Sequence, residues 1–314
     1  MIGKFRRHLC AAAAAGLLAW AGCAEKRVDA PQVATESSVT PLRVFVVNTP
    51  LAYFAQRIGG DAVEVVFPAP PDVDPAFWLP DADTIGAYQT ADLILRNGAG
   101  YAGWIDRATL PESRIVDTSA AFRERLLPIE GAATHQHGPK GDHTLAGAAF
   151  TTWLDPGLAR LQAAAVFEAL AALRPSARSS FLERLQALEA ELAALDARLS
   201  RAAQLIGAEP LLFSHPVYRY LIARYELNAR SLHWEPDAMP EAEAWAELAA
   251  LRAEFPARWL VWESEPSPET RRRLQEWGVA SVVFNPAANR APASSWLRAM
   301  NLGASALEQI AAQQ

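Results

Sequence analysis

The chain has 314 residues, of which 51% are hydrophobic, enough apolar sequence for two domains of ordinary size. Its 35 acidic residues outnumber its 29 basic ones, and apart from the three arginines at 271–273 no basic run follows Arg7, which argues against a nucleic acid as partner. It has only two cysteines, so stability must come mainly from a hydrophobic core.

The N-terminus has the parts of an export signal over residues 1–22. Three basic residues precede an apolar run at residues 9–20, which ends in the small pair at 21–22. The run is too short for a permanent membrane span, which needs about 20 residues. Cys23 follows directly, and this arrangement resembles the bacterial lipobox, in which cleavage leaves a lipidated cysteine. Trp20 stands where that box usually has Leu, Val or Ile, so ordinary secretion is the alternative.

Either route places the protein outside the cytoplasm, in the periplasm or at the cell surface. Cleavage would leave 26 basic and 35 acidic residues, a net charge of −9. Residues 23–40 are polar and without periodicity, which is typical of a flexible tether.

A first α/β lobe is expected over residues 41–174. Short β-like runs alternate there with helical patterns, which predicts a mostly parallel sheet flanked by helices. The expected strands are 42–47, 63–67, 92–95 and 114–116.

One long helix is predicted over residues 175–206, where Ala, Leu, Arg and Glu dominate. Leucines recur there at threes and fours and form one apolar stripe. The stripe comprises Leu182, Leu185, Leu188, Leu192, Leu195 and Leu199. A coiled coil is the alternative, but the stripe lasts only three heptads, which favours a helix that links two lobes.

A second α/β lobe is expected over residues 207–314, where the alternation returns. The expected strands are 211–213, 231–233, 259–262 and 281–284, and the expected helices are 216–225, 241–255, 268–277 and 296–311. Two exported lobes joined by one helix favour a solute receptor, because ligand clefts form at the carboxyl ends of parallel strands.

Several segments in order resemble the zinc- and manganese-binding solute receptors of bacterial ABC transporters (cluster A-I, helical-backbone metal receptors). They include the proline-rich turn at 70–75, the WLDP motif at 153–156 before the long helix, Ser214-His215, and Glu265-Pro266-Ser267. The resemblance covers nearly all of residues 41–312. It implies a monomeric receptor, not an enzyme, that delivers Zn²⁺, or alternatively Mn²⁺, to an ABC permease and touches the membrane only through its lipid.

The resemblance also places four metal-ligand positions on this sequence, and only one keeps a typical ligand. The positions fall on Ala76, Thr151, His215 and Asn285. One imidazole with Thr and Asn oxygens would coordinate Zn²⁺ poorly, because zinc favours four ligands of Cys, His or carboxylate type.

A histidine-rich segment before WLDP is one possible compensation. Zinc receptors of the family often carry a mobile loop there, and this chain has His135, His137 and His143 in it. His143 is the best candidate to replace the imidazole missing at Thr151. The alternative is that these are solvated loop histidines without a metal.

The second lobe offers further candidate ligands. His215 and His233 lie on adjacent predicted strands, so their side chains are expected to converge on one ion. Glu235 or Glu263 would add a carboxylate. A hydrogen-bonded structural role for His233, and a salt bridge for Glu263, are the alternatives. Imidazole ligands protonate near pH 6.5, so binding is expected to weaken below about pH 6.

Other functions remain open at this point. Trp78 and Trp234 fall near predicted cleft loops and would wall a pocket for a metal chelate or a small organic solute, although tryptophans are commonly core residues. A surface adhesion protein is a further alternative. An enzyme is not expected, because no nucleophile elbow or HExxH motif occurs.

Overall fold

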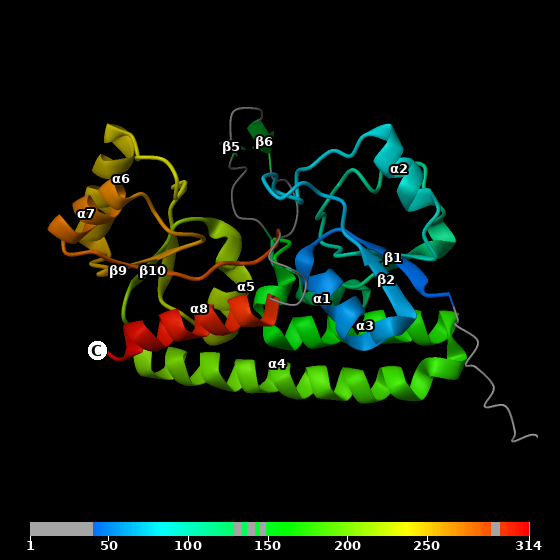
Figure 1. The fold of residues 1–314 in the computed structure, drawn as a ribbon. Helices are drawn as coiled ribbons and strands as arrows, with labels where there is room; N and C mark the ends of the chain where they lie inside the picture. Colours follow the sequence, from blue (N-terminus) through cyan, green and yellow to red (C-terminus); the bar gives the residue numbers. More distant parts are fainter. Residues whose placement is uncertain (1–39, 129–133, 137–141, 145–148, 290–295, 314) are drawn as a thin grey trace, which may run out of the picture. The chain divides into compact units, whose positions relative to one another are not determined.

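The computed structural model describes residues 40–128, 134–136, 142–144, 149–289 and 296–313. The expected signal, Cys23 and most of the tether lie outside these residues. Residues 40–314 make up one compact unit, in which two parallel four-stranded sheets lie above a layer of long helices (Figure 1). Within the described ranges, no helix combines the length and the apolarity that crossing a bilayer requires.

The first sheet has the strand order β2-β1-β3-β4 and is parallel throughout. Its strands are β1 Leu42–Val46, β2 Val63–Val66, β3 Leu93–Arg96 and β4 Ile115–Asp117. Helices α1 (Thr49–Gly59) and α2 (Ala82–Gln89) connect them. The predicted parallel α/β lobe is therefore confirmed, with strand ends within two residues of the expected ones.

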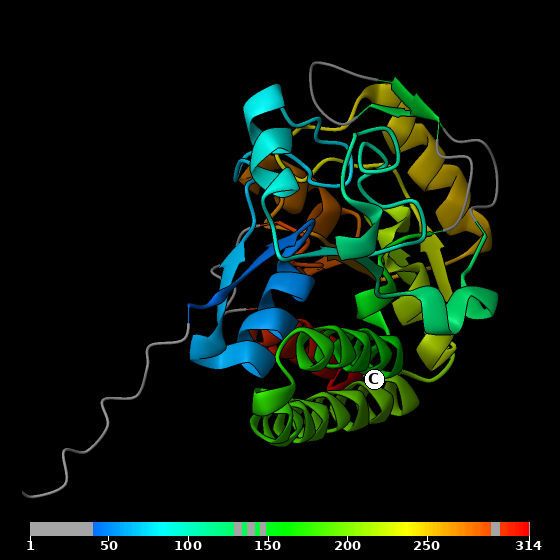
Figure 2. The same cartoon turned by 90° about the vertical axis from the view of Figure 1, so that its right-hand side faces the viewer.

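The long helices form a layer beneath both sheets (Figures 1 and 2). They are α3 (Pro156–Leu173), α4 (Arg178–Ile206) and α8 (Trp296–Ala311). Helix α4 has 29 residues, and α3 and α8 both pack on it. Asp155 caps the start of α3, because its Oδ1 accepts from the amides of Gly157 at 2.7 Å and Leu158 at 3.3 Å.

The apolar stripe of α4 packs into the chain's own core, so α4 is the linking helix and not a coiled-coil segment. One member of the predicted stripe is wrong: Leu182 is 41% exposed, and the fully buried Phe181 takes its place. From Phe181 the buried positions recur at steps of four and three to Leu199, which is the regular helical spacing.

The second sheet has the order β10-β9-β7-β8 and is also parallel. Its strands are β7 Leu211–Phe213, β8 Ala229–Ser231, β9 Trp259–Trp262 and β10 Ala280–Val283. Helices α5 (Arg219–Tyr225), α6 (Ala242–Glu254) and α7 (Pro268–Glu276) accompany it.

Strand β8 begins two residues before the predicted strand at 231–233. Its register opposite β7 runs from Ala229 to Ser231. The backbone then stays hydrogen-bonded beyond the strand, with the amides of Leu232 and Trp234 donating to Phe213 at 2.8 Å and Ser214 at 3.0 Å. His233 thus follows β8 on this extended segment.

One hydrophobic core extends from the first sheet through α3, α4 and α8 to β7 and β9, and a smaller core lies in the second lobe around Trp245 and Trp262. The ring of Trp296 in α8 lies 5.3 Å from Tyr53 and 5.1 Å from Phe54, both in α1. The last helix therefore ties the chain's end to the first lobe. The domain boundaries that the sequence predicts on either side of the linking helix, at 174/175 and 206/207, remain a prediction.

Candidate functional site

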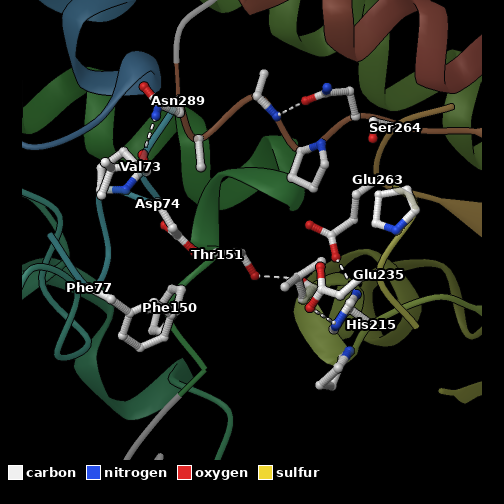
Figure 3. A pocket seen from close by; sticks show the side chains of 18 of the residues that line it. Val73, Asp74, Phe77, Phe150, Thr151, His215, Glu235, Glu263, Ser264 and Asn289 are labelled. Carbon is white, nitrogen blue, oxygen red and sulfur yellow. Dashed lines mark hydrogen bonds and ion pairs between the residues drawn. The ribbon is translucent and has the colours of Figure 1, made fainter. Parts of the chain in front are cut away.

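A cleft of about 730 Å³ opens at the carboxyl ends of both sheets. The proline-rich turn and the segment at 149–151 wall it from the first lobe. Loops that follow β7, β8, β9 and β10 wall it from the second. Parallel strands end at one edge of a sheet, which is why loops distant in sequence meet there. Figure 3 shows the side chains that line the cleft.

An imidazole between two carboxylates dominates the wall of the second lobe. The His215 Nδ1 lies 2.8 Å from an oxygen of Glu263, and its Nε2 lies 3.4 Å from an oxygen of Glu235 (Figure 3). The His215 side chain is only 5% exposed. The three residues follow the adjacent strands β7, β9 and β8, so the sheet order itself brings them together.

Opposing effects act on the pKa of His215. Burial lowers this pKa, because it disfavours the charged imidazolium. The hydrogen bonds and charges of Glu235 and Glu263 outweigh burial and raise the pKa to about 9. At neutral pH His215 is therefore an imidazolium held by two carboxylates, and a metal ion has to displace its proton to coordinate it.

His233 lines the same wall, with its ring 6.3 Å from the ring of His215. The structure therefore brings together His215, His233, Glu235 and Glu263 on one wall of the cleft. Their convergence on one metal ion stays a prediction. The carboxylates of Glu263 and Glu235 lie against the two imidazole nitrogens of His215. Within the described ranges, no three His, Cys, Asp or Glu side chains are arranged to hold a metal ion.

The other three family ligand positions have local structural roles. The hydroxyl of Thr151 donates to the carbonyl of Val217 at 2.5 Å. The side-chain oxygen of Asn285 accepts from the amide of Ala287 at 2.7 Å. Ala76 is buried and has no donor atom on its side chain. Among these positions only His215 offers a strong zinc ligand.

Aromatic and acidic residues of the first lobe complete the cleft. The rings of Phe77 and Phe150 lie 6.0 Å apart, edge to face, and both are partly exposed. Tyr101 packs on Phe150, and its hydroxyl finds no hydrogen-bond partner among the described residues. Burial, together with the charge of Asp74, raises the pKa of Tyr101 well above its usual value.

Sequence reasoning missed these first-lobe residues, although a signal was present. Phe77 and Phe150 are the direct neighbours of the lost ligand positions Ala76 and Thr151, and Asp74 lies in the proline-rich turn. A search around each lost position for residues that change the chemistry of the cleft would have found them.

The two tryptophans expected in the cleft lie elsewhere. Trp78 packs against Trp104 at 6.3 Å. Trp234 is 5% exposed and packs in the smaller core against Trp245 at 4.8 Å and Trp262 at 6.2 Å. Apolar contact in the smaller core outcompetes the cleft for Trp234, while Trp78 lies half-buried on Trp104.

The histidine-rich segment is described only in part. Strands β5 (Thr134–Gln136) and β6 (Asp142–Thr144) pair antiparallel, with His135 opposite His143. His137 lies outside the described residues. The role of this segment at the cleft stays a prediction.

The WLDP motif connects the two lobes beside the cleft. The Trp153 indole donates to the carbonyl of Pro286 at 2.8 Å. Asp155, besides capping α3, lies 3.6 Å from Arg224 of α5 and 3.6 Å from Arg125. The motif therefore positions the cleft walls without lining the cleft itself.

A buried polar network holds the Phe150–Thr151 segment in place. The Asn97 amide donates to the carbonyl of Phe150 at 2.8 Å, and the Gln162 amide donates to Asn97 at 3.1 Å and Thr118 at 3.0 Å. Thr152 in turn donates to Gln162 at 3.1 Å. All four side chains that form this network are fully buried.

The family model "Zinc-uptake complex component A periplasmic" (ZnuA) matches residues 44–310. The chain belongs to this family. Members are periplasmic solute-binding components of metal uptake, so the predictions of the family and of a binding protein that is not an enzyme are confirmed.

Individual relatives agree with this membership. The zinc-binding protein TroA of Treponema pallidum is 29% identical over 189 residues, which span 59% of this chain and 58% of TroA. The metal-dependent lipoprotein YcdH of Bacillus subtilis superposes with a TM-score of 0.73 at 21% identity, over 85% of this chain and 98% of that one. Zn(II)-bound AdcA of Streptococcus pneumoniae gives 0.73 at 20% identity, over 88% and 59%. The structural matches show the shared fold.

Proposed function

We propose that this protein is a lipid-anchored extracytoplasmic receptor that binds a divalent transition metal, with zinc favoured, in the cleft and delivers it to an ABC permease. The observation that carries the proposal is His215, the one retained family ligand, held between Glu235 and Glu263 at the cleft wall. An imidazole and two carboxylates are ligand types that Zn²⁺ accepts.

The metal would replace the proton shared within this group. Once His215 loses one of its two ring protons, the lone pair of that nitrogen becomes a ligand, and the carboxylate beside the same nitrogen, Glu235 at Nε2 or Glu263 at Nδ1, is the candidate oxygen ligand. The other carboxylate would hold the remaining N–H and orient the ring. His233 is the candidate second imidazole of this wall, and His143 the candidate from the histidine-rich segment. Asn285 is expected to contribute at most a weak carbonyl oxygen, since that oxygen already accepts from Ala287.

Manganese is the alternative cargo, because carboxylate oxygens suit Mn²⁺ better than Zn²⁺. Anchoring through Cys23 follows from the lipobox resemblance, and the relative YcdH is named as a lipoprotein. The acidic net charge of −6 is compatible with a cationic cargo.

Calorimetric titration tests the proposal on metal-stripped protein from residue 24 onward, which retains the compact unit of residues 40–314. We expect one-to-one binding of Zn²⁺ that His215→Ala abolishes and Glu263→Gln weakens. Glu269→Gln, an exposed change on α7 outside the cleft, is the matched control and should bind normally. A triple His135, His137 and His143 variant tests the loop.

Each result has a clear meaning. Loss of affinity in the loop variant would support a loop histidine as ligand. Zinc binding that survives His215→Ala would refute a metal receptor centred on His215. So would a failure of the unchanged protein to bind zinc, whether supplied as the free ion or as a chelate. Tighter binding of Mn²⁺ than Zn²⁺ would keep the site and change the cargo.

A further inference from the structure

The cleft is much larger than a bare metal ion needs. Its volume is about 730 Å³, while a water molecule occupies about 30 Å³ in the liquid. A protein cage for a bare ion closes four ligands around it at about 2 Å, whereas pockets for small molecules span about 300–1,000 Å³. The size of this cleft therefore fits a small molecule.

Among the described residues, three of the four family ligand positions supply no strong donor to a bare ion. Of the four family positions, only His215 offers a strong ligand, while Thr151 and Asn285 have local hydrogen bonds. Donors that the protein does not supply can come from the solute, if the metal arrives already bound to a chelator.

Opposite the charged wall, the first lobe presents two aromatic rings. Figure 3 shows Phe77 and Phe150 across the cleft from His215. Both rings are partly exposed and line the cleft. A hydrated ion gains nothing from such a surface, but a flat apolar body gains burial and edge or face contacts with the rings.

A cationic side chain lines the same cleft. Arg219, the first residue of α5, is among the residues that line the cleft from the second lobe. A guanidinium repels a bare divalent cation, but it suits a carboxylate, which it can bind with two parallel hydrogen bonds.

We infer that the metal enters this cleft as a complex with a small, carboxylate-bearing chelator that has a flat apolar body. The metal faces His215, the carboxylate faces Arg219, and the flat body lies against Phe77 and Phe150. The inference rests on the proposed function, because the metal remains the group recognised at His215.

Two zinc chelates with the same donor atoms test it. Dipicolinate and iminodiacetate each offer one nitrogen and two carboxylates to Zn²⁺, but only dipicolinate has a planar ring. Calorimetry with metal-stripped protein would compare Zn²⁺ alone, each preformed one-to-one chelate and metal-free dipicolinate, and native mass spectrometry would count the bound components.

The zinc–dipicolinate complex should bind as an intact unit, at least about tenfold tighter than Zn²⁺ alone or zinc–iminodiacetate, which is the effect of about 1.4 kcal/mol. Phe150→Ala should remove the difference in affinity between the two zinc chelates, and Phe77→Leu, a milder change, should reduce it. Leu79→Ala is the control, since Leu79 is 68% exposed and outside the cleft wall. Arg219→Gln should weaken both chelates about tenfold without weakening Zn²⁺ alone.

The affinities of the unchanged protein for these four ligands are enough to test the inference, so the test does not depend on whether a variant folds. Zn²⁺ alone binding as tightly as its dipicolinate complex, or dipicolinate stripping the zinc, would overturn the chelate and leave the metal receptor intact. Equal binding of metal-free dipicolinate would overturn it in favour of an organic solute. If no form of zinc binds, the proposed function fails as well.

Discussion

The two carboxylates beside His215 predict a raised pKa for its imidazole in the metal-free protein. An unperturbed histidine titrates near 6.5, while the contacts to Glu263 at 2.8 Å and Glu235 at 3.4 Å hold His215 at a pKa of about 9. Each unit corresponds to about 1.4 kcal/mol, so the difference is worth about 3 kcal/mol. Glu263→Gln removes the nearer charge and should bring the pKa back toward 6.5.

The same difference makes stability depend on pH. The folded protein holds the proton more tightly than the unfolded chain, so the stabilisation is fully present below pH 6.5. It is lost as the pH rises through about 9. His215→Gln, which cannot titrate, should lack this loss.

Two measurements on metal-free protein check the prediction. An NMR titration of the imidazole protons, assigned with His215→Gln, gives the pKa directly. Urea unfolding at pH 6.5 and pH 9.5 should show the unchanged protein losing about 3 kcal/mol relative to His215→Gln. Glu269→Gln is the control and should leave the pKa of His215 at about 9.

A measured pKa at or below 6.5 would refute the reasoning, because it would mean that burial outweighs the two carboxylates. A pKa near 9 would also correct the pH range expected from the sequence. Metal binding would then weaken as the pH falls below about 9, and not only below about 6, because the metal competes with a more tightly held proton.

Three further predictions concern the scaffold and the anchor. In urea unfolding, Leu188→Ala should lower the free energy of unfolding by about 3 kcal/mol, because Leu188 is fully buried. Leu182→Ala should lower it by less than about 1 kcal/mol, because Leu182 is 41% exposed. Gln162→Leu should lower the free energy of unfolding by about 2–3 kcal/mol, because it removes three buried hydrogen bonds, to Asn97, Thr118 and Thr152. Cys23→Ser should move the protein from the membrane to the soluble fraction and abolish incorporation of a labelled fatty acid; unchanged fractionation would contradict lipid anchoring.

Much of the fold follows from local sequence pattern. The strands at 42–46, 211–213 and 259–262 are short apolar runs, and the long helix ends at Ile206, directly before Gly207, as expected from its sequence. Errors arose where the local signal was ambiguous. Phe181 and Leu182 are adjacent apolar residues, and the packing of α4 on its neighbouring helices decides which of the two faces the core.

The candidate site was predictable in part, for a related reason. His215, His233, Glu235 and Glu263 were expected to converge because parallel strands end at a common edge. Trp78 and Trp234 were expected in the cleft and lie elsewhere, since the direction of a side chain in a loop depends on neighbours that sequence proximity does not reveal.

Periodicity, caps and motif order thus determine the elements, the two lobes and the family, because these depend on residues close together in the chain. The chemistry of the cleft depends on residues far apart in it. Strand order sets Glu235 and Glu263 on either side of His215 and raises its pKa, and interlobe packing places Phe77 and Phe150 opposite. Distances of a few ångströms between remote segments decide the charge and shape that a solute meets, and only the tertiary structure provides those distances.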